Sequence, residues 1–213
     1  MIINSVTLEF RKVVKRESHI IGGPEIMTRR IRFKHPECVE DTVTVKVKRG
    51  QTKRQLEKGR DYTIDHRDYA LVIPPEFDLL DGDTFILSYE YVVASADLST
   101  DGNIFVNGRW KEEILGSMTT QSGEIINWSG GWRFYLTIGI RKDKLHAWDL
   151  KELAQKLSTW LNDDKRIYCV FPGSDEGCYL VPNIEIRQYS TELELFNFKS
   201  KHRFKKILGI KTQ

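Results

Sequence analysis

The stretch Val-Thr-Val-Lys-Val-Lys at residues 43–48 decides the fold class, because it alternates an apolar residue with a polar one at every position. Successive side chains of a β-strand point to opposite faces of the sheet, so this pattern predicts a strand with one buried face of valines. The same period of two recurs at 6–10, and a long β-branched and aromatic run occupies 84–93. We therefore expect antiparallel sheets with one face toward a core.

Turn signals divide the first hundred residues into short strands. Residues 62–64 and 69–73 are typical of a hairpin around the polar turn at 65–68, and Asp-Gly-Asp at 81–83 marks another turn. A further β-pattern occupies 26–33, after Gly22-Gly23-Pro24. Short strands at this spacing predict an N-terminal antiparallel β-sandwich over residues 1–96.

The second half of the chain has a different pattern. Residues 97–130 are less regular, and turn signals at 101–103 and 107–108 favour a short hairpin within an irregular connection. A strong strand follows at 132–141. The spacing of apolar residues then predicts one helix that begins at an Asp149 N-cap, with this apolar stripe: Leu150, Leu153, Ala154, Leu157, Trp160 and Leu161.

Four more strands are predicted after the helix, at 167–171, 177–181, 184–189 and 193–198. Residues 131–198 thus form a smaller α+β domain with the order β-α-β-β-β, and a basic tail occupies 199–213. The whole chain is expected to be mainly β with one helix.

The composition bounds the class of protein. The chain has 213 residues, of which 40% are hydrophobic and 30% charged, a balance typical of soluble globular proteins. Its apolar runs are far shorter than the roughly 20 residues of a membrane-spanning helix. The N-terminal residues lack the basic and apolar regions of a secretory signal, so we expect folding in a cytoplasm and no membrane partner.

The three cysteines agree with a reducing compartment, because an odd number of widely spaced cysteines does not suggest a disulfide framework. Cys169 and Cys178 could face each other across a hairpin. We interpret them as small buried apolar residues.

Signatures of catalysis are missing from the sequence. The five histidines are scattered and form no pair with metal-ligand spacing: His19, His35, His66, His146 and His202. No phosphate-binding glycine loop and no nucleophile elbow is present. We therefore expect no catalytic residue, no metal and no cofactor.

Charge is unevenly distributed along the chain. Residues 11–60 carry 15 Lys or Arg against 6 Asp or Glu, whereas 61–100 carry 9 acidic residues against a single arginine. Either solvated faces differ in sign, or neighbouring subunits are electrostatically complementary. Nucleic-acid binding is disfavoured, because a single-strand binder needs exposed aromatic side chains among its basic ones.

The C-terminal tail mixes large apolar residues with lysines. Phe204, Ile207 and Leu208 are too apolar for a free tail. Two interpretations remain open: these side chains dock on a neighbouring chain as it assembles, or they complete the sheet of their own domain.

Three segments carry a resemblance: Gly-Arg-Asp-Tyr-Thr-Ile at 59–64, Tyr-Ala-Leu-Val-Ile-Pro at 69–74, and Leu-Asp-Gly-Asp-Thr-Phe-Ile-Leu-Ser-Tyr-Glu-Tyr at 80–91. Together they resemble a recurring β-sandwich module of tailed-bacteriophage virion proteins, found in tail, fibre and neck components. The expected helix ending in Trp160-Leu161, with the strands at 167–171 and 177–180, is similar to the distal tail proteins. These subunits form a ring below the tail tube.

The resemblance implies a non-catalytic structural subunit of a phage tail, baseplate or neck, which binds copies of itself and other virion proteins. The alternative is a carbohydrate- or receptor-binding module, since Trp110, Trp128 and Trp132 cluster near turns. The residues expected at interfaces are Arg30, Arg32, Lys46 and Lys48 on a basic surface, Asp78, Asp81 and Asp83 on an acidic one, and Phe204, Ile207 and Leu208 in the tail.

Overall fold

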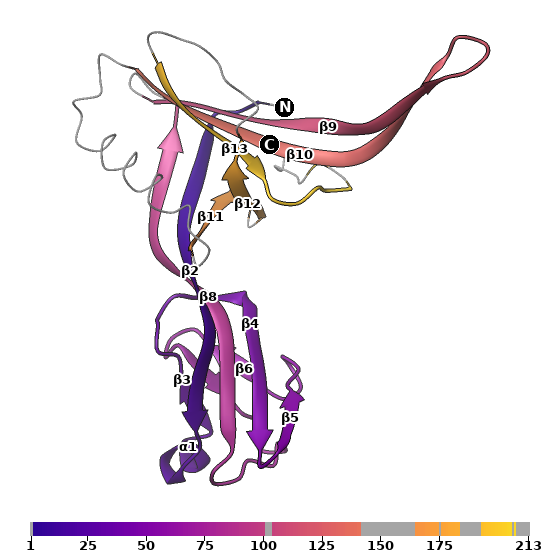
Figure 1. The fold of residues 1–213 in the computed structure, drawn as a ribbon. Helices are drawn as coiled ribbons and strands as arrows, with labels where there is room; N and C mark the ends of the chain where they lie inside the picture. The colour runs from indigo at the N-terminus through magenta and orange to yellow at the C-terminus, as the bar shows by residue number, and fades with distance from the viewer. Residues whose placement is uncertain are drawn as a thin grey trace. The chain divides into compact units, whose positions relative to one another are not determined.

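The structure, a computed structural model, describes residues 2–100, 104–141, 165–174, 176–183, 193–205 and 207. The described residues fold mainly into β-strands, which confirms the predicted fold class, and their one helix is the short α1 (Gly23–Thr28). The chain divides into two compact units (Figure 1). The discontinuous unit comprises Met1–Phe10 and Ala94–Gln213, and the inserted unit comprises Arg11–Val93.

The inserted unit is a sandwich of two sheets. One sheet has the order β2 (Ser5–Ile20), β8 (Thr84–Ser99), β4 (Cys38–Arg49) and β5 (Thr52–Gln55). The other has the order β3 (Arg30–Arg32), β7 (Ala70–Val72) and β6 (Thr63–Asp65). The predicted hairpin at 62–73 is confirmed, because β6 and β7 pair in antiparallel register across the turn.

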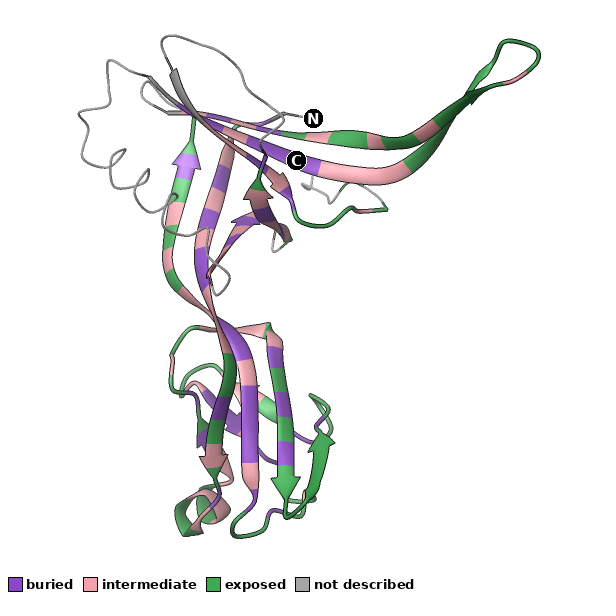
Figure 2. Cartoon of the chain, viewed as in Figure 1, coloured by how far each residue is buried: buried purple, intermediate pink, exposed green. Residues whose placement is uncertain are grey.

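The core of this sandwich follows the alternation from which the fold was predicted. Val43, Val45 and Val47 are buried, while the lysines between and after them are exposed (Figure 2). Phe85, Leu87 and Tyr89 continue the buried face on β8, and the opposite sheet contributes Ile31 and Leu71. The period of two therefore places one face of each strand against the other sheet.

The strand predicted at 26–33 is wrong for its first residues. Pro24 stands in the first turn of α1, and the Glu25 carboxylate accepts a hydrogen bond from the Gly22 amide at 3.1 Å. Arg29 then ends the helix in the left-handed region, with φ 53°. Its guanidinium donates to backbone carbonyl oxygens of residues 73, 74 and 77. These contacts at the two ends of the helix outweigh the apolar alternation that predicted a strand.

The discontinuous unit is built around a long hairpin. Its strands have the order β1 (Ile2–Ile3), β9 (Ile104–Thr119), β10 (Ile125–Arg141), β13 (Leu193–Ser200), β12 (Gly177–Pro182) and β11 (Lys165–Val170), followed by the start of β2 and the end of β8. Leu8 and Phe10 of β2 pack in one core with Phe134, Leu136 and Ile138 of β10.

The irregular connection predicted at 97–130 is wrong, because β9 and β10 pair along most of their length. Asn107-Gly108 forms no turn and lies inside β9, opposite Thr137 and Leu136. The glycine has a packing role instead: a Cβ at Gly108 would lie 2.7 Å from Cζ of Phe134. Close approach of an aromatic ring, rather than a turn, explains this residue.

The structure also changes the predicted domain limits. The change of unit after Val93 lies close to the predicted end at 96, but residues 1–10 belong to the discontinuous unit. The basic tail predicted from 199 begins inside the sheet, since β13 runs to Ser200 and the Lys201 amide donates to the Tyr179 carbonyl. The helix predicted from Asp149 and the strand at 184–189 lie outside the described residues.

Cys169 and Cys178, interpreted from the sequence as small buried residues that could face each other, are buried and do face each other. Cys169 of β11 and Cys178 of β12 are register partners, and both are free and buried. Burial raises the pKa of Cys178 to about 12 and the pKa of Cys169 well above its usual value. A thiol reacts through its thiolate, so both should be inert in the folded chain.

We expect an aromatic disulfide reagent to modify neither Cys169 nor Cys178 in the native protein at pH 8, and to modify both after unfolding in guanidinium. Cys38 is only half-buried, although burial raises its pKa too. The control is a Cys38→Ser variant, which should show no rapidly reacting thiol. Rapid modification of this folded variant would contradict the buried hairpin.

Candidate protein interface

The basic residues expected at an interface lie on two strands of the inserted unit. Lys46 and Lys48 are exposed on β4, and Arg32 is exposed on β3. Arg30 differs, because its guanidinium makes ion pairs with Asp65 and Asp68 of its own unit. Three of the four predicted cations are therefore open to solvent, while Arg30 is already neutralised.

The acidic surface predicted around residues 78–83 needs a correction at Asp83. Asp78 and Asp81 are exposed, but Asp83 is 2% exposed. Both Asp83 oxygens accept hydrogen bonds from Arg49 at 2.8 Å, and the Leu80 amide donates to one of them at 3.1 Å. Asp83 therefore holds a turn together and cannot contribute to an exposed acidic surface.

The aromatic and apolar residues predicted in the C-terminal tail also differ in how far they are buried. Phe204 is half-buried, and its ring packs against Trp110 with centroids 5.5 Å apart. Its amide and carbonyl both bond to Trp132, so Phe204 completes the sheet of its own domain. Ile207 is 38% exposed, and Leu208 lies outside the described residues.

The three tryptophans suggested for sugar binding do not form one platform. Trp110 packs against Phe134 and Phe171 at centroid distances of 5.3 and 5.7 Å. Trp132 pairs with Phe204, as described above. Trp128 alone is half exposed, with 50% of its surface accessible. The carbohydrate alternative thus loses the cluster on which it depended.

Among the described residues, more than half of the exposed large hydrophobic side chains lie at the far end of the β9–β10 hairpin, within the segment predicted to be irregular. Strand β1 reaches only Gly108 and Arg109 of β9, and β13 pairs with β10 only from Tyr135 onward. Phe204 adds a single bridge at Trp132. Among the described residues no third strand pairs beyond these points, and we call the two-stranded segment 112–131 the distal ribbon.

Apolar side chains are concentrated on the distal ribbon. Of the eleven large hydrophobic residues exposed in the described part of the chain, six lie here: Ile114, Leu115, Met118, Ile125, Ile126 and Trp128. Their accessible fractions range from 45% to 68%. Between Ile114 and Trp132 the only charged residue is Glu124. A monomer would not be expected to expose so many apolar side chains together without a use for them.

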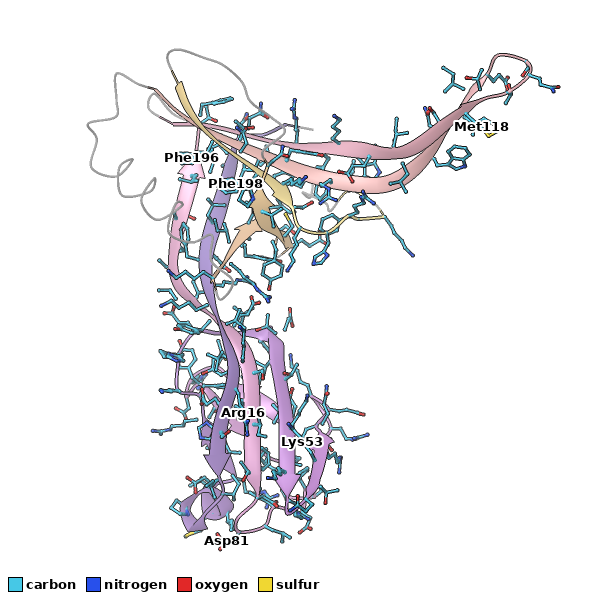
Figure 3. The ribbon with its side chains drawn as sticks, in the orientation of Figure 1. Arg16, Lys53, Asp81, Met118, Phe196 and Phe198 are labelled. Atoms are coloured by element: carbon cyan, nitrogen blue, oxygen red, sulfur yellow. The ribbon has the colours of Figure 1, made fainter. Side chains whose placement is uncertain are left out.

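The strand register sorts these side chains onto two faces. Met118 is opposite Ile126, and Gly116 is opposite Trp128, so Met118, Ile126 and Trp128 share a face. The tryptophan ring lies across Gly116, since a Cβ there would be 3.1 Å from its Cε3. Figure 3 shows Met118 near the tip of the ribbon. We call this the apolar face.

The opposite face of the ribbon is mixed. Ser117 is opposite Asn127, and Thr119 is opposite Ile125. The ribbon is therefore amphipathic, although no sheet or helix among the described residues covers its apolar face.

The root of the ribbon is held by a bulge and an ion-pair cluster. The β9–β10 register shifts between Trp128 and Trp132, where Gly131 has φ +90°. Glu113 accepts a 2.8 Å hydrogen bond from Arg133 and also pairs with Arg203. Burial alone would raise the pKa of Glu113, but the two arginines outweigh it and lower this pKa. These contacts fix the direction in which the ribbon leaves the sheet.

The sequence did carry a signal for this ribbon. Residues 126–128 place large apolar residues at every second position, as in the strands that were recognised. The glycines, serines and threonines between them resemble a loop, and pairing over so long a range is not visible in a local pattern.

We expect Asp83→Asn to lower the free energy of unfolding by about 1–2 kcal/mol at pH 7, because Arg49 loses its ion pair and one of its two acceptors on this side chain. Hydrogen bonding from Arg49 lowers the pKa of Asp83 in the folded state. This contribution is therefore present above the ordinary carboxyl pKa and is lost as the pH falls through the folded value. Urea unfolding followed by far-UV circular dichroism should show the difference shrinking toward pH 3.

The matched control for Asp83→Asn is Asp81→Asn, which removes an exposed carboxylate two residues away. It should leave stability unchanged. Equal effects of the two substitutions would contradict the buried arrangement of Asp83.

We expect Gly131→Ala to destabilise the discontinuous unit by about 1–3 kcal/mol, because a Cβ would lie 2.6 Å from the Phe204 carbonyl oxygen. Gly123 provides a matched control: it has φ +85° but nothing within 4 Å of a Cβ. All five tryptophans lie in this unit, so tryptophan fluorescence during urea unfolding reports on it. Identical losses in the two variants would argue against the tight root.

Three further observations bear on the class of site. No helix in the described ranges is long and apolar enough to cross a membrane. Within the same ranges, no group of three or more His, Cys, Asp or Glu residues is arranged to hold a metal ion. No family model, no curated protein and no solved structure matches the chain. The candidate site is therefore defined by geometry, as an amphipathic ribbon with an uncovered apolar face.

Proposed function

We propose that this chain is a structural subunit that assembles with copies of itself through the distal ribbon. The observation that carries the proposal is the apolar face of Met118, Ile126 and Trp128, each of which is 45–50% exposed. A two-stranded hairpin alone is only marginally stable in water. Docking on another subunit would both cover this face and stabilise the ribbon.

The free energy gained when another subunit covers the apolar face indicates the kind of assembly. Complete burial of a large apolar side chain is worth about 1.5–3 kcal/mol, so covering the exposed half gains about 1 kcal/mol per residue. The three side chains together supply about 3 kcal/mol, which is below the cost of association, about 4–15 kcal/mol. One ribbon contact is therefore too weak to hold a dimer, and several contacts made together are needed.

A ring satisfies this requirement. A ribbon that docks on a different surface of its neighbour makes a head-to-tail contact, and such contacts close into rings when the rotation between subunits allows it. Each subunit then both provides a ribbon and receives one. The resemblance of residues 59–91 to virion modules supports a tail, baseplate or neck ring of a phage as the setting.

The exposed charges of the inserted unit have a secondary role in this proposal. Arg32, Lys46 and Lys48 would steer subunits toward acidic surfaces and accelerate their encounter. The apolar face of the ribbon carries no charged residue, so the assembled contact should resist salt, whereas contacts between exposed charges are screened. Salt should therefore slow assembly more than it weakens the product.

Light scattering with negative-stain imaging tests the proposal on the full chain. We expect a defined oligomer that persists at high salt, and we expect a variant with Met118→Ser and Ile126→Ser to be a folded monomer. The control, Thr119→Ser with Asn127→Ser, changes the mixed face and should assemble normally. A wild-type monomer at every concentration, or normal assembly of the apolar-face variant, would contradict self-assembly through the ribbon.

A further inference from the structure

The inserted unit contains a pocket of about 580 Å³ that shares no residue with the distal ribbon. It opens between the end of β4, strand β5 and the loops at 60–61 and 76–78. Pockets of this size are typical of small-molecule sites. Its wall combines an apolar part with a polar rim.

The apolar part consists of Val47 and Phe77. Val47 is 8% exposed and belongs to the core. The ring of Phe77 is half-buried, with its centroid 6.2 Å from that of Phe85. The core thus holds one aromatic ring at the pocket wall, where it offers an apolar surface to a ligand.

The polar rim is held in place by Asp61. This carboxylate is 5% exposed and accepts hydrogen bonds from Arg54 at 2.9 and 3.0 Å. Arg60 and the Glu57 amide donate to it as well, at 3.2 and 3.0 Å. Hydrogen bonding from Arg60 is the main reason that the pKa of Asp61 falls to about 2. The Asp61 carboxylate therefore stays ionised, and can accept hydrogen bonds from both arginines, at any moderate pH.

Part of the rim remains available for a ligand. Arg54 uses only Nη2 on Asp61, so its Nε and Nη1 donors have no partner among the described residues. Glu76, in the same wall, makes no hydrogen bond or ion pair within the part of the chain that the structure describes. The pocket thus offers two donors and a carboxylate acceptor beside an aromatic ring.

The pocket lining has no net charge. Three arginines, Arg49, Arg54 and Arg60, are balanced by three acids, Asp61, Glu76 and Asp78. An anion or a cation would gain attraction from one set and repulsion from the other. A neutral ligand that both donates and accepts hydrogen bonds matches this wall better.

We propose that this pocket binds a neutral sugar ring. Each sugar hydroxyl can accept from Arg54 and donate to Glu76, and the C–H face of the ring can lie against Phe77. The site goes beyond the proposed assembly function and is independent of it, because pocket and ribbon belong to different units.

Saturation-transfer NMR on the full chain tests the site, with the methyl glycosides of glucose, galactose, mannose and N-acetylglucosamine as probes. We expect transfer to the ring protons of at least one glycoside. Glu76→Gln should weaken its binding roughly tenfold, because a neutral amide is a poorer acceptor than a carboxylate. Phe77→Leu, which keeps an apolar side chain, should have an effect of similar size.

The matched control is Lys53→Ala, which removes a cation next to Arg54 on β5, outside the pocket wall (Figure 3). It should bind like the wild type. Circular dichroism confirms the fold of each variant, and Glu76→Gln breaks no contact of the described chain. Absence of transfer to all four glycosides, or a preference for acetate or phosphate over them, would overturn the proposal.

Discussion

The packing of Phe134 determines how the discontinuous unit is organised. Its ring lies over Gly108 of the neighbouring strand and contacts Phe171 edge-on, with centroids 4.8 Å apart. Trp110 joins the same cluster and brings Phe204 with it. This aromatic cluster stands where β9 and β10 leave the sheet. It provides the fixed base from which a ribbon without further strands can extend.

The ribbon follows a rule that applies to every sheet: a strand buries only the face that another layer covers. On the sheet side of Trp132, β10 has the β11–β12 strands and the N-terminal residues over its apolar face. Beyond the bulge the same alternation continues, and no described layer covers it. The chain thus extends a core-like pattern past its own core. An assembling subunit has a use for such a surface, whereas a self-sufficient monomer does not.

Much of the fold could be predicted from the sequence, because a period of two is a local property. The strands around Val45, the hairpin at 62–73 and the facing pair Cys169 and Cys178 follow from that period and from turn residues. The prediction failed where glycine had a different role. Gly108 was interpreted as a turn, yet it is present because Phe134 of another strand needs the space. That need depends on a partner 26 positions away and leaves no local trace.

The candidate site was harder to predict for a related reason. Charged residues were predicted at an interface because their clustering is visible along the chain. Asp83 and Arg30, however, form hydrogen bonds and ion pairs with residues of their own unit. Whether a charged side chain is neutralised within its own unit depends on contacts between distant segments. The apolar face needed the register of β9 against β10, which joins Gly116 to Trp128 and Met118 to Ile126. The pocket likewise required four separate segments to meet.

The apolar face of the ribbon carries no charged residue, and this affects the solubility of the free subunit. An edge with unsatisfied backbone groups and apolar side chains can pair with other edges, which is the usual start of aggregation. Glu124 at the tip, with Lys111 and Glu112 at the root, are the charges in a position to discourage such pairing. In a subunit that assembles as proposed, this hazard would end only when the ribbon is covered. Its synthesis would have to be matched to its consumption, so that little of it accumulates before assembly.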